Sequence, residues 1–300
     1  MNIPFSSFAV SFVILLIAGG NLTCRAADDR QPPYSGLPPA PAGFRWELNP
    51  DLSDEFTGTT LDTAKWLDHF PGWMGRPPAK FIPENILVTN GCLQIHDSRL
   101  SQPAGDYTIG GGAVVSKNHG FYGYYEVRMK ASKVRMSSTF WLSNDRPKTG
   151  DTSSAQELDI VETIGGPPAK PDWASKVNQS MNSTLHCFYW LQKPEDLRAY
   201  NKAPLFPPSG DAFHVYGAWW VDADTVKFYL DSKYQGTQHP STKYSGHPFD
   251  RPMHINMVTE CYDWARPVPT AEELNDPAIN TTYYNWVRAY KLVGNDPGTK

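Results

Sequence analysis

The chain has 300 residues and an apolar fraction of 40%, which suits one large domain or two small ones with a substantial core. Its net charge of −4 gives no electrostatic reason to expect nucleic acid or an anionic membrane as a partner. Ten Trp, fifteen Tyr and fourteen Phe indicate a large β core or a long sugar-binding cleft, because pyranose rings stack on indoles.

A short apolar run at residues 8–20 is followed by Cys24-Arg-Ala-Ala27. The run is too short to cross a bilayer comfortably and too close to the N-terminus for a core helix, so it predicts a signal peptide over residues 1–26. We therefore expect a secreted or periplasmic protein with no membrane contact in its mature form. The alternatives are an uncleaved anchor helix and a lipid anchor at Cys24, although Thr23 is larger than the residue that usually precedes a lipidated cysteine.

Residues 27–50 are rich in proline and lack periodicity, which predicts a linker. No second linker and no repeat follows, so one domain is expected over residues 51–300. This part contains three cysteines, and an odd number cannot pair completely, so buried free thiols are expected although one bridge is possible. No Cys/His spacing indicates zinc. The three cysteines are Cys92, Cys187 and Cys261.

Short β-type runs separated by turn clusters fill this domain, and several alternate apolar and polar residues as half-buried antiparallel strands do. A helical pattern is confined to residues 270–275. Many short strands with few helices predict an all-β fold, an antiparallel β-sandwich of jelly-roll type with a concave cleft for a long polymer. The predicted strands cover residues 85–89, 92–95, 111–116, 122–130, 138–142, 183–190, 214–220, 225–231, 253–258 and 284–290.

Three carboxylates lie close together in the β-prone run Gln156-Glu-Leu-Asp-Ile-Val-Glu162. Acids are depleted in strands and like charges repel, so this cluster is costly to keep folded. Alternation places Glu157 and Asp159 on one face and Glu162 on the other. A β-bulge near Ile160-Val161 would return Glu162 to the first face, with Leu158 and one of the two bulge residues facing the core.

Three acids on one face suit glycoside hydrolysis with retention of configuration. One carboxylate attacks the sugar and a second donates a proton to the leaving oxygen from roughly 5–5.5 Å away. Glu157 and Glu162 have a suitable separation, while Asp159 between them would orient its neighbours and raise the pKa of the nearby acid. The alternative is a solvated strand face or a cation-binding acidic patch.

The motif Glu157-Leu-Asp-Ile-Val-Glu162 resembles the signature of glycoside hydrolase family 16 in its bulged form. The resemblance covers about residues 52–293, including Ser53-Asp-Glu-Phe56, Leu61-Asp-Thr-Ala-Lys-Trp66, Gly123-Tyr-Tyr-Glu-Val-Arg128, Ser138-Thr-Phe-Trp-Leu142, Phe213-His-Val-Tyr-Gly217 and Thr281-Thr-Tyr-Tyr-Asn-Trp-Val-Arg288. It implies a retaining endo-hydrolase of β-linked glucans or galactans. It also implies that Glu157 is the nucleophile, Glu162 the general acid/base and Asp159 the supporting acid, with no cofactor required for catalysis.

Three segments near the C-terminus are similar to sequences of the agarase and porphyranase branch, which cleaves β-1,4 bonds in red-algal galactans. These segments cover residues 256–264, 269–275 and 280–288. Trp73-Met-Gly-Arg76 lacks the Gly-Pro-Gly form of many agarases, and an Arg fork suits a sulfate ester. Porphyran is therefore a close second to agarose as the expected substrate, and κ-carrageenan a distant third. A β-1,3-glucanase (laminarinase) of the same family and a non-catalytic carbohydrate-binding sandwich are the remaining alternatives.

Six further residues are candidates for binding the polysaccharide, each with a structural alternative as a core or surface residue. The family resemblance also implies a calcium ion on the convex side of the sandwich, where Asp54 and Asn285 offer oxygen ligands. A structural calcium ion is therefore possible at that pair. We expect the chain to act as a monomer. The six candidates are Trp73, Arg76, Trp141, His186, Glu260 and Trp264.

Overall fold

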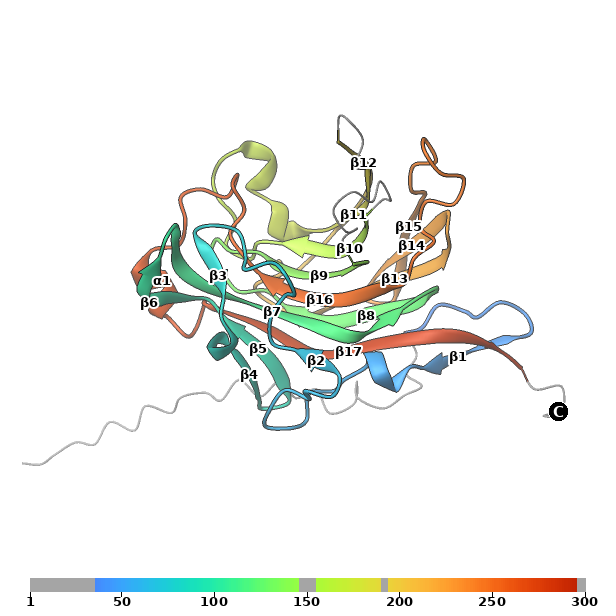
Figure 1. Cartoon of the computed structure of the whole chain (residues 1–300), viewed down its shortest axis with the longest axis horizontal. Coiled ribbons are helices and arrows are strands. Elements are labelled where there is room, and N and C mark those ends of the chain that lie inside the picture. The colour runs from blue at the N-terminus through green and yellow to red at the C-terminus, as the bar shows by residue number, and fades with distance from the viewer. Residues whose placement is uncertain (1–35, 146–154, 190–193, 296–300) are drawn as a thin grey trace, which may run out of the picture.

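A computed structural model gives the fold of residues 36–145, 155–189 and 194–295. The expected signal peptide and the first part of the expected linker lie outside the described residues. Within these ranges two mainly antiparallel sheets of eight and nine strands pack face to face as a jelly-roll sandwich (Figure 1). This confirms the predicted fold class. We call the sheet that contains the acidic motif the front sheet and the other the back sheet.

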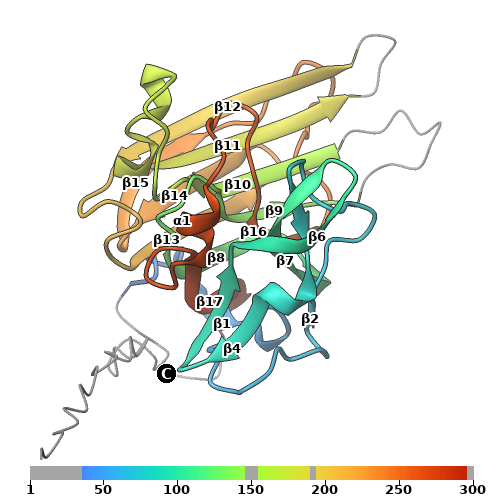
Figure 2. The same ribbon diagram turned by 90° about the vertical axis from the view of Figure 1, so that its left-hand side faces the viewer.

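In the front sheet, β12, β11, β10 and β9 run side by side (Figure 2). Its order is β12 (Glu195–Pro204), β11 (Ser180–Tyr189), β10 (Ala155–Thr163), β9 (Ser138–Ser143), β16 (Met253–Thr259), β7 (Tyr107–Gly120) and β2 (Trp66–Leu67). Two further strands pair with β7, namely β3 (Ala79–Phe81) and β6 (Ser98–Ala104).

The back sheet has the order β15 (Lys233–Gln238), β14 (Thr225–Leu230), β13 (His214–Asp222), β8 (Gly123–Lys130), β17 (Thr281–Gly294), β5 (Cys92–His96) and β4 (Ile86–Thr89), and β1 (Phe44–Leu48) pairs with β17. The described helices are short: α1 (Ala271–Asn275), η1 (Pro50–Leu52), η2 (Pro83–Asn85), η3 (Asp172–Ala174) and η4 (Val177–Gln179). None of them is long and apolar enough to cross a membrane.

The main core lies between the sheets and supports the acidic motif from behind. Leu158 on β10 is fully buried and faces Leu142 on β9 and Leu185 on β11. Burying an aliphatic side chain of this size contributes about 1.5–3 kcal/mol to stability. Ile160 and Val161 are both buried in the same cluster, whereas alternation predicted only one of them. The bulge therefore turns two consecutive apolar residues into the core.

Every strand predicted from the sequence overlaps an observed strand, and the predicted helical turn is α1, which begins with a capping box between Thr270 and Glu273. The predicted end of the linker at residue 50 is wrong. β1 pairs with β17 along its full length, and the Trp46 ring contacts the Trp219 ring edge-on at 5.3 Å between centroids. The domain therefore begins before residue 51.

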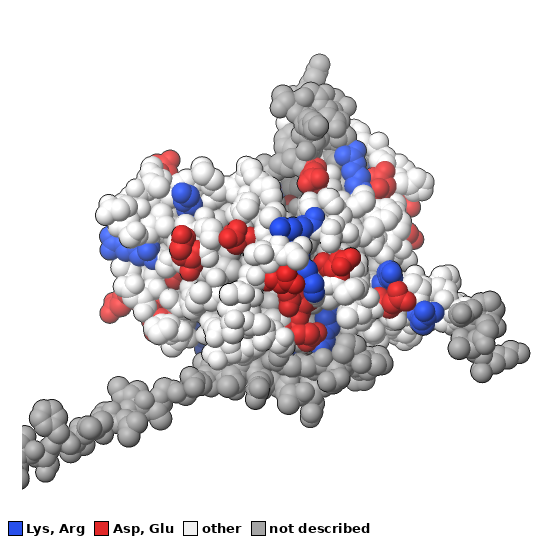
Figure 3. All heavy atoms as spheres, turned by 60° about the horizontal axis from the view of Figure 1, so that its bottom comes forward, with Lys and Arg blue, Asp and Glu red and all other residues white. Residues whose placement is uncertain are grey.

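The fold also places the charged side chains and the cysteines of the sequence. On the face shown in Figure 3, Lys and Arg lie among Asp and Glu rather than in an area of one sign. Cys187 and Cys261 are buried free thiols, as expected, whereas Cys92 is disulfide-bonded and departs from that expectation.

Leu158 provides a test of the core beneath the motif. Leu158→Ala leaves a cavity between the sheets, so we expect the free energy of unfolding to fall by about 2–5 kcal/mol. Leu87→Ala on β4 is the matched control, because Leu87 is 46% exposed and its loss should change stability by less than about 0.5 kcal/mol. Urea unfolding measures both, and equal losses would contradict the core position of Leu158.

Candidate active site

A β-bulge in β10 gathers the three acids of the motif. The register against β9 shifts between Asp159 and Val161, so Ile160 is the extra residue. Alternate residues of a strand share a face, and the three acids lie opposite alternate residues of β9. Glu162 is thereby returned to the face of Glu157, as the sequence predicts. The residues opposite Glu157, Asp159 and Glu162 are Ser143, Trp141 and Thr139 respectively.

His186 on β11 lies on the other side of β10, directly opposite Glu157. Its Nε2 atom lies 3.1 Å from an Asp159 oxygen and 3.9 Å from a Glu157 oxygen, and its Nδ1 atom lies 2.9 Å from Asp196. Burial opposes a charged ring, but the contacts with Asp159 and Asp196 outweigh it and raise the pKa of His186 to about 10. His186 is therefore an imidazolium at neutral pH.

Burial dominates the electrostatics of the acids. It raises the pKa of Glu157 well above the ordinary value, with the charge of Asp159 adding to the effect and that of His186 opposing it. Burial also raises the pKa of Asp159, and His186 again opposes the rise. Burial and the charge of Asp159 raise the pKa of Glu162 to about 7. The site can therefore hold a protonated carboxyl near neutral pH, beside one cation that stabilises an ionised one.

Tyr262 is a residue of the site that the sequence analysis missed. Its hydroxyl donates a hydrogen bond of 2.6 Å to Glu162, which stabilises the ionised form and so opposes the rise in the Glu162 pKa. The signal was present in the sequence, because Tyr262 lies two positions after Glu260 and two before Trp264. Alternation in an extended segment would have placed it with the chosen residues.

Two adjoining cavities lie along the front sheet. The first, of about 380 Å³, contains all three acids with Arg76, Glu260 and Tyr262. The second, of about 450 Å³, extends past Glu157 toward Asn256 and the end of β9. Four residues line both cavities: Trp73, Trp141, Glu157 and Phe188. Together the cavities form an elongated cleft, and the predicted binding residues Trp73 and Trp141 both line it.

Arg76 and Glu260, both predicted to bind substrate, contact each other. The guanidinium Nε lies 3.1 Å from a Glu260 oxygen, and the guanidinium carbon lies 5.3 Å from the centre of the Tyr262 ring. Burial raises the pKa of Glu260 to about 7, while Arg76 opposes the rise. The pair holds a planar cation in the wall of the cavity that contains the acids.

Trp264, like His186, is a predicted binding residue that lines neither cavity. Its ring stacks on Tyr262 with centroids 5.2 Å apart and contacts Trp173 with centroids 4.7 Å apart. Trp173 is 61% exposed, so the three rings form a series that leads from Glu162 toward solvent. Trp264 supports Tyr262 from behind, and Trp173, which the sequence analysis did not single out, presents the free surface.

The pair Asp54 and Asn285 does not fit a calcium ion. The two oxygens of Asp54 accept hydrogen bonds from the Phe56 amide at 2.8 Å and the Trp66 indole at 3.0 Å. The Asn285 oxygen accepts from the Arg128 guanidinium at 3.0 Å, so a cation already lies against it. The contacts of these two residues therefore serve the fold.

Comparison with known proteins gives a consistent result. Residues 46–292 match the family model described as "Beta-porphyranase A-D, GH16 domain". A β-porphyranase B from Phocaeicola plebeius is 50% identical over 285 residues, which cover 86% of this chain and 88% of the relative. An extracellular agarase from Streptomyces coelicolor is 28% identical over 312 residues, covering 92% of this chain and 94% of the agarase.

Among solved structures, the β-porphyranase BpGH16B from Bacteroides plebeius has a TM-score of 0.82 and 49% identity, covering 87% of this chain and 97% of that one. These matches make the chain an enzyme rather than a non-catalytic sugar-binding sandwich. The chain belongs to glycoside hydrolase family 16 and is a hydrolase of its agarase and porphyranase branch.

Proposed function

We propose that this enzyme is a secreted, monomeric endo-hydrolase that cleaves β-1,4-galactosidic bonds in porphyran with retention of configuration. The observation that carries the substrate choice is the Arg76 guanidinium in the wall of the cavity with the three acids. The relatives named as β-porphyranases support the same choice. The apolar run at residues 8–20 supports export.

In the proposed reaction Glu157 attacks the anomeric carbon while Glu162 donates a proton to the leaving oxygen. A glycosyl-enzyme forms, and water then releases the sugar as Glu162 takes a proton back. Burial raises the pKa of Glu157, and the His186 imidazolium, 3.9 Å from that carboxylate, opposes the rise and so helps to stabilise the ionised nucleophile. Asp159 favours a protonated Glu162, because its negative charge raises the pKa of that acid.

Sulfate recognition by Arg76 follows from the chemistry of its pair with Glu260. A guanidinium presents several N–H donors in one plane, and a single carboxylate contact at 3.1 Å leaves others for an anionic oxygen. Glu260 has a pKa raised to about 7, so its charge is easily lost when an anion approaches. A sulfate ester beside the cleaved bond would then receive charge-assisted hydrogen bonds from Arg76.

The substrate proposal is tested with Arg76→Ala on porphyran and on agarose. A hydrogen bond to a charged group contributes about 1.5–3 kcal/mol, so we expect kcat/KM on porphyran to fall about 10- to 100-fold. On agarose, which has no sulfate ester to lose, the change should be much smaller. Reducing-end release and product sizing measure both, with κ-carrageenan and laminarin completing the panel.

Two controls separate sulfate binding from general damage. Arg45→Ala removes an exposed cation on β1 and should leave both rates unchanged. Arg76→Ala combined with Glu260→Gln removes the acid that Arg76 would otherwise leave unpaired, and should keep the selective loss on porphyran. A wild-type enzyme that prefers agarose, or a porphyran-to-agarose ratio unmoved by Arg76→Ala, would reject porphyran as the substrate.

The two glutamates are tested with azide as an external nucleophile. On polymer, Glu157→Ala and Glu162→Ala should each lose about 100-fold activity or more. On an aryl glycoside, which needs no acid, the Glu162→Ala enzyme with azide should yield the β-azide through the glycosyl-enzyme. Under the same conditions Glu157→Ala should yield the α-azide by direct attack. NMR of the products distinguishes these results, and exchanged anomers would reverse the two roles.

The hydrogen bond from Tyr262 is tested through the pH profile. Glu162 must carry a proton to donate it, so with a pKa of about 7 we expect kcat/KM to fall as pH rises through that value. Tyr262→Phe removes a donor that stabilises the ionised carboxylate, so the alkaline limb should move to higher pH. Tyr234→Phe on the back sheet is the control and should not move it. A limb unchanged or displaced to lower pH in Tyr262→Phe would contradict the role of Tyr262.

A further inference from the structure

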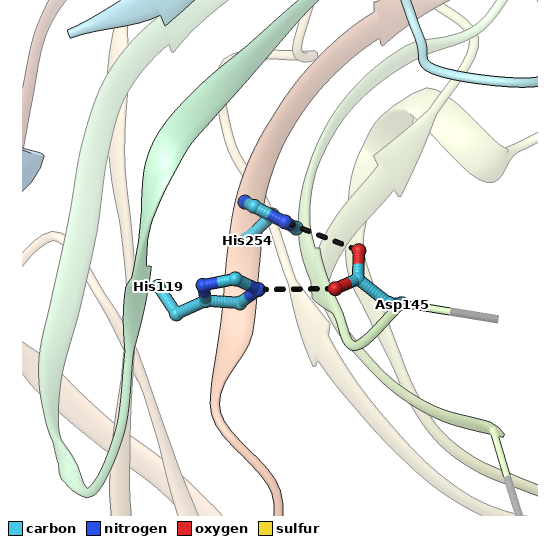
Figure 4. Close-up of side chains that lie close together, drawn as sticks. All are labelled: His119, Asp145 and His254. Atoms are coloured by element: carbon cyan, nitrogen blue, oxygen red, sulfur yellow. Dashed lines mark ion pairs between the residues drawn. The ribbon is translucent and has the colours of Figure 1, made fainter. Parts of the chain in front are cut away.

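Three side chains outside the acidic motif converge at the far end of the second cavity (Figure 4). The His119 Nε2 atom lies 3.5 Å from one oxygen of Asp145, and the His254 Nε2 atom lies 3.3 Å from the other. The two imidazole rings lie one above the other, with centroids 3.7 Å apart and planes at 37°. His254 and Asp145 line the cavity.

The backbone of the front sheet fixes this arrangement. His119 on β7 and His254 on β16 are directly opposed residues of one antiparallel ladder. On its other side His254 is opposed by Ser143 on β9, and Asp145 follows two residues later. Two independent ladders therefore bring the three residues together, although they lie far apart in the sequence.

The hydrogen bonding of His254 leaves its outer nitrogen free to act as a ligand. Its Nδ1 atom lies 2.7 Å from the Ser116 carbonyl oxygen, which only accepts, so Nδ1 carries the hydrogen. In the neutral ring the lone pair is then on Nε2, which faces Asp145. A hydrogen bond from the second ring nitrogen to a backbone carbonyl is the usual outer contact of a metal-bound histidine.

The spacing of the ligand atoms agrees with a tetrahedral ion. Bonds of about 2.0–2.1 Å at tetrahedral angles separate neighbouring ligand atoms by roughly 3.3–3.5 Å. The two histidine nitrogens lie 3.3 and 3.5 Å from different oxygens of Asp145, and one ligand atom from each of the three residues lies within 4.8 Å of the other two. Two imidazoles and one carboxylate favour zinc, cobalt, nickel or copper over calcium or magnesium, which prefer oxygen ligands alone.

A second cluster, made of Glu157, Asp159 and His186, has similar spacing but different chemistry. Both ring nitrogens of His186 face carboxylates, Asp159 at 3.1 Å and Asp196 at 2.9 Å. A ring held between two carboxylates keeps both hydrogens and has no lone pair to give to a metal. The cluster at the far end of the cavity is therefore the better ligand set.

We propose that His119, Asp145 and His254 bind one transition-metal dication of the zinc class. Three protein ligands leave a fourth position of the ion open, as in zinc sites that take a water or a substrate oxygen. Because Asp145 and His254 line the cavity, that position faces the cleft and would take an oxygen donor lying there. The inference does not depend on the identity of the polysaccharide.

The test is titration of the chelator-treated full chain with zinc chloride by calorimetry, and with cobalt chloride by visible absorption. We expect saturable 1:1 zinc binding and the intense visible bands of tetrahedral cobalt. His119→Ala, His254→Ala and Asp145→Asn should each weaken zinc binding at least 10-fold. The exposed positions of His119 and Asp145 make misfolding of those two variants a poor explanation, and circular dichroism checks all three.

Two variants serve as controls. His247→Ala removes a surface histidine that faces Asp224 at 3.5 Å and belongs to no three-ligand group among the described residues, so zinc binding should stay unchanged. Glu157→Gln alters the second cluster and should also leave it unchanged. The proposal is overturned if the wild-type chain shows no saturable binding, if binding survives all three ligand variants, or if Glu157→Gln abolishes binding while His254→Ala does not.

Discussion

The bulge at Ile160 is the constraint on which the rest of the site depends. A regular β10 would place Glu162 on the core side of the front sheet, where a carboxyl among Leu158 and its neighbours would be buried without a partner. The register shift instead returns Glu162 to the cleft and packs both Ile160 and Val161 into the core. One extra residue thus places the third acid in the cleft and buries two apolar side chains in the core. A bulge in this position is therefore a feature of the fold's function rather than an irregularity of the strand.

Burial of three carboxyls on one face would be severely unfavourable without a nearby cation. His186 on the neighbouring strand supplies this cation by its contact with Asp159. Asp196 on β12 contacts the other nitrogen of the ring and stabilises its positive charge. The two glutamates of the motif have different polar partners. Glu157 lies near the cation, whereas Glu162 lies against the hydroxyl of Tyr262. Both partners stabilise an ionised carboxylate against the burial that raises the pKa of each glutamate, His186 by its charge and Tyr262 by a hydrogen bond.

Much of the fold was predictable because its central strands alternate clearly, and the acidic motif was predictable because charge in an apolar run is unusual. The strands that the sequence analysis missed each pair with only one neighbouring strand among the described residues. In β1 the first two residues are exposed and the others half-buried, so no alternation marks it. Tertiary pairing with β17 makes it a strand, and the expected linker consequently ended too late. Edge strands of this kind depend on a partner that local pattern does not contain.

Sequence spacing could not predict contacts between side chains that strand pairing brings together from distant parts of the chain. His119 and His254 are neighbours because β7 and β16 pair in one register, and no local motif marks either residue. The strand β16 also positions residues at both ends of the cleft. β16 places His254 in the second cavity, and the segment that follows it brings Glu260 and Tyr262 beside Glu162 in the first.

A slip of one residue in the register of β16 would turn all of these side chains to the opposite face, because side chains alternate along a strand. The buried Met257 and Ile255 on the core side of β16 oppose such a slip. The packing between the sheets, rather than any contact in the cleft itself, therefore holds the two ends of the cleft in alignment.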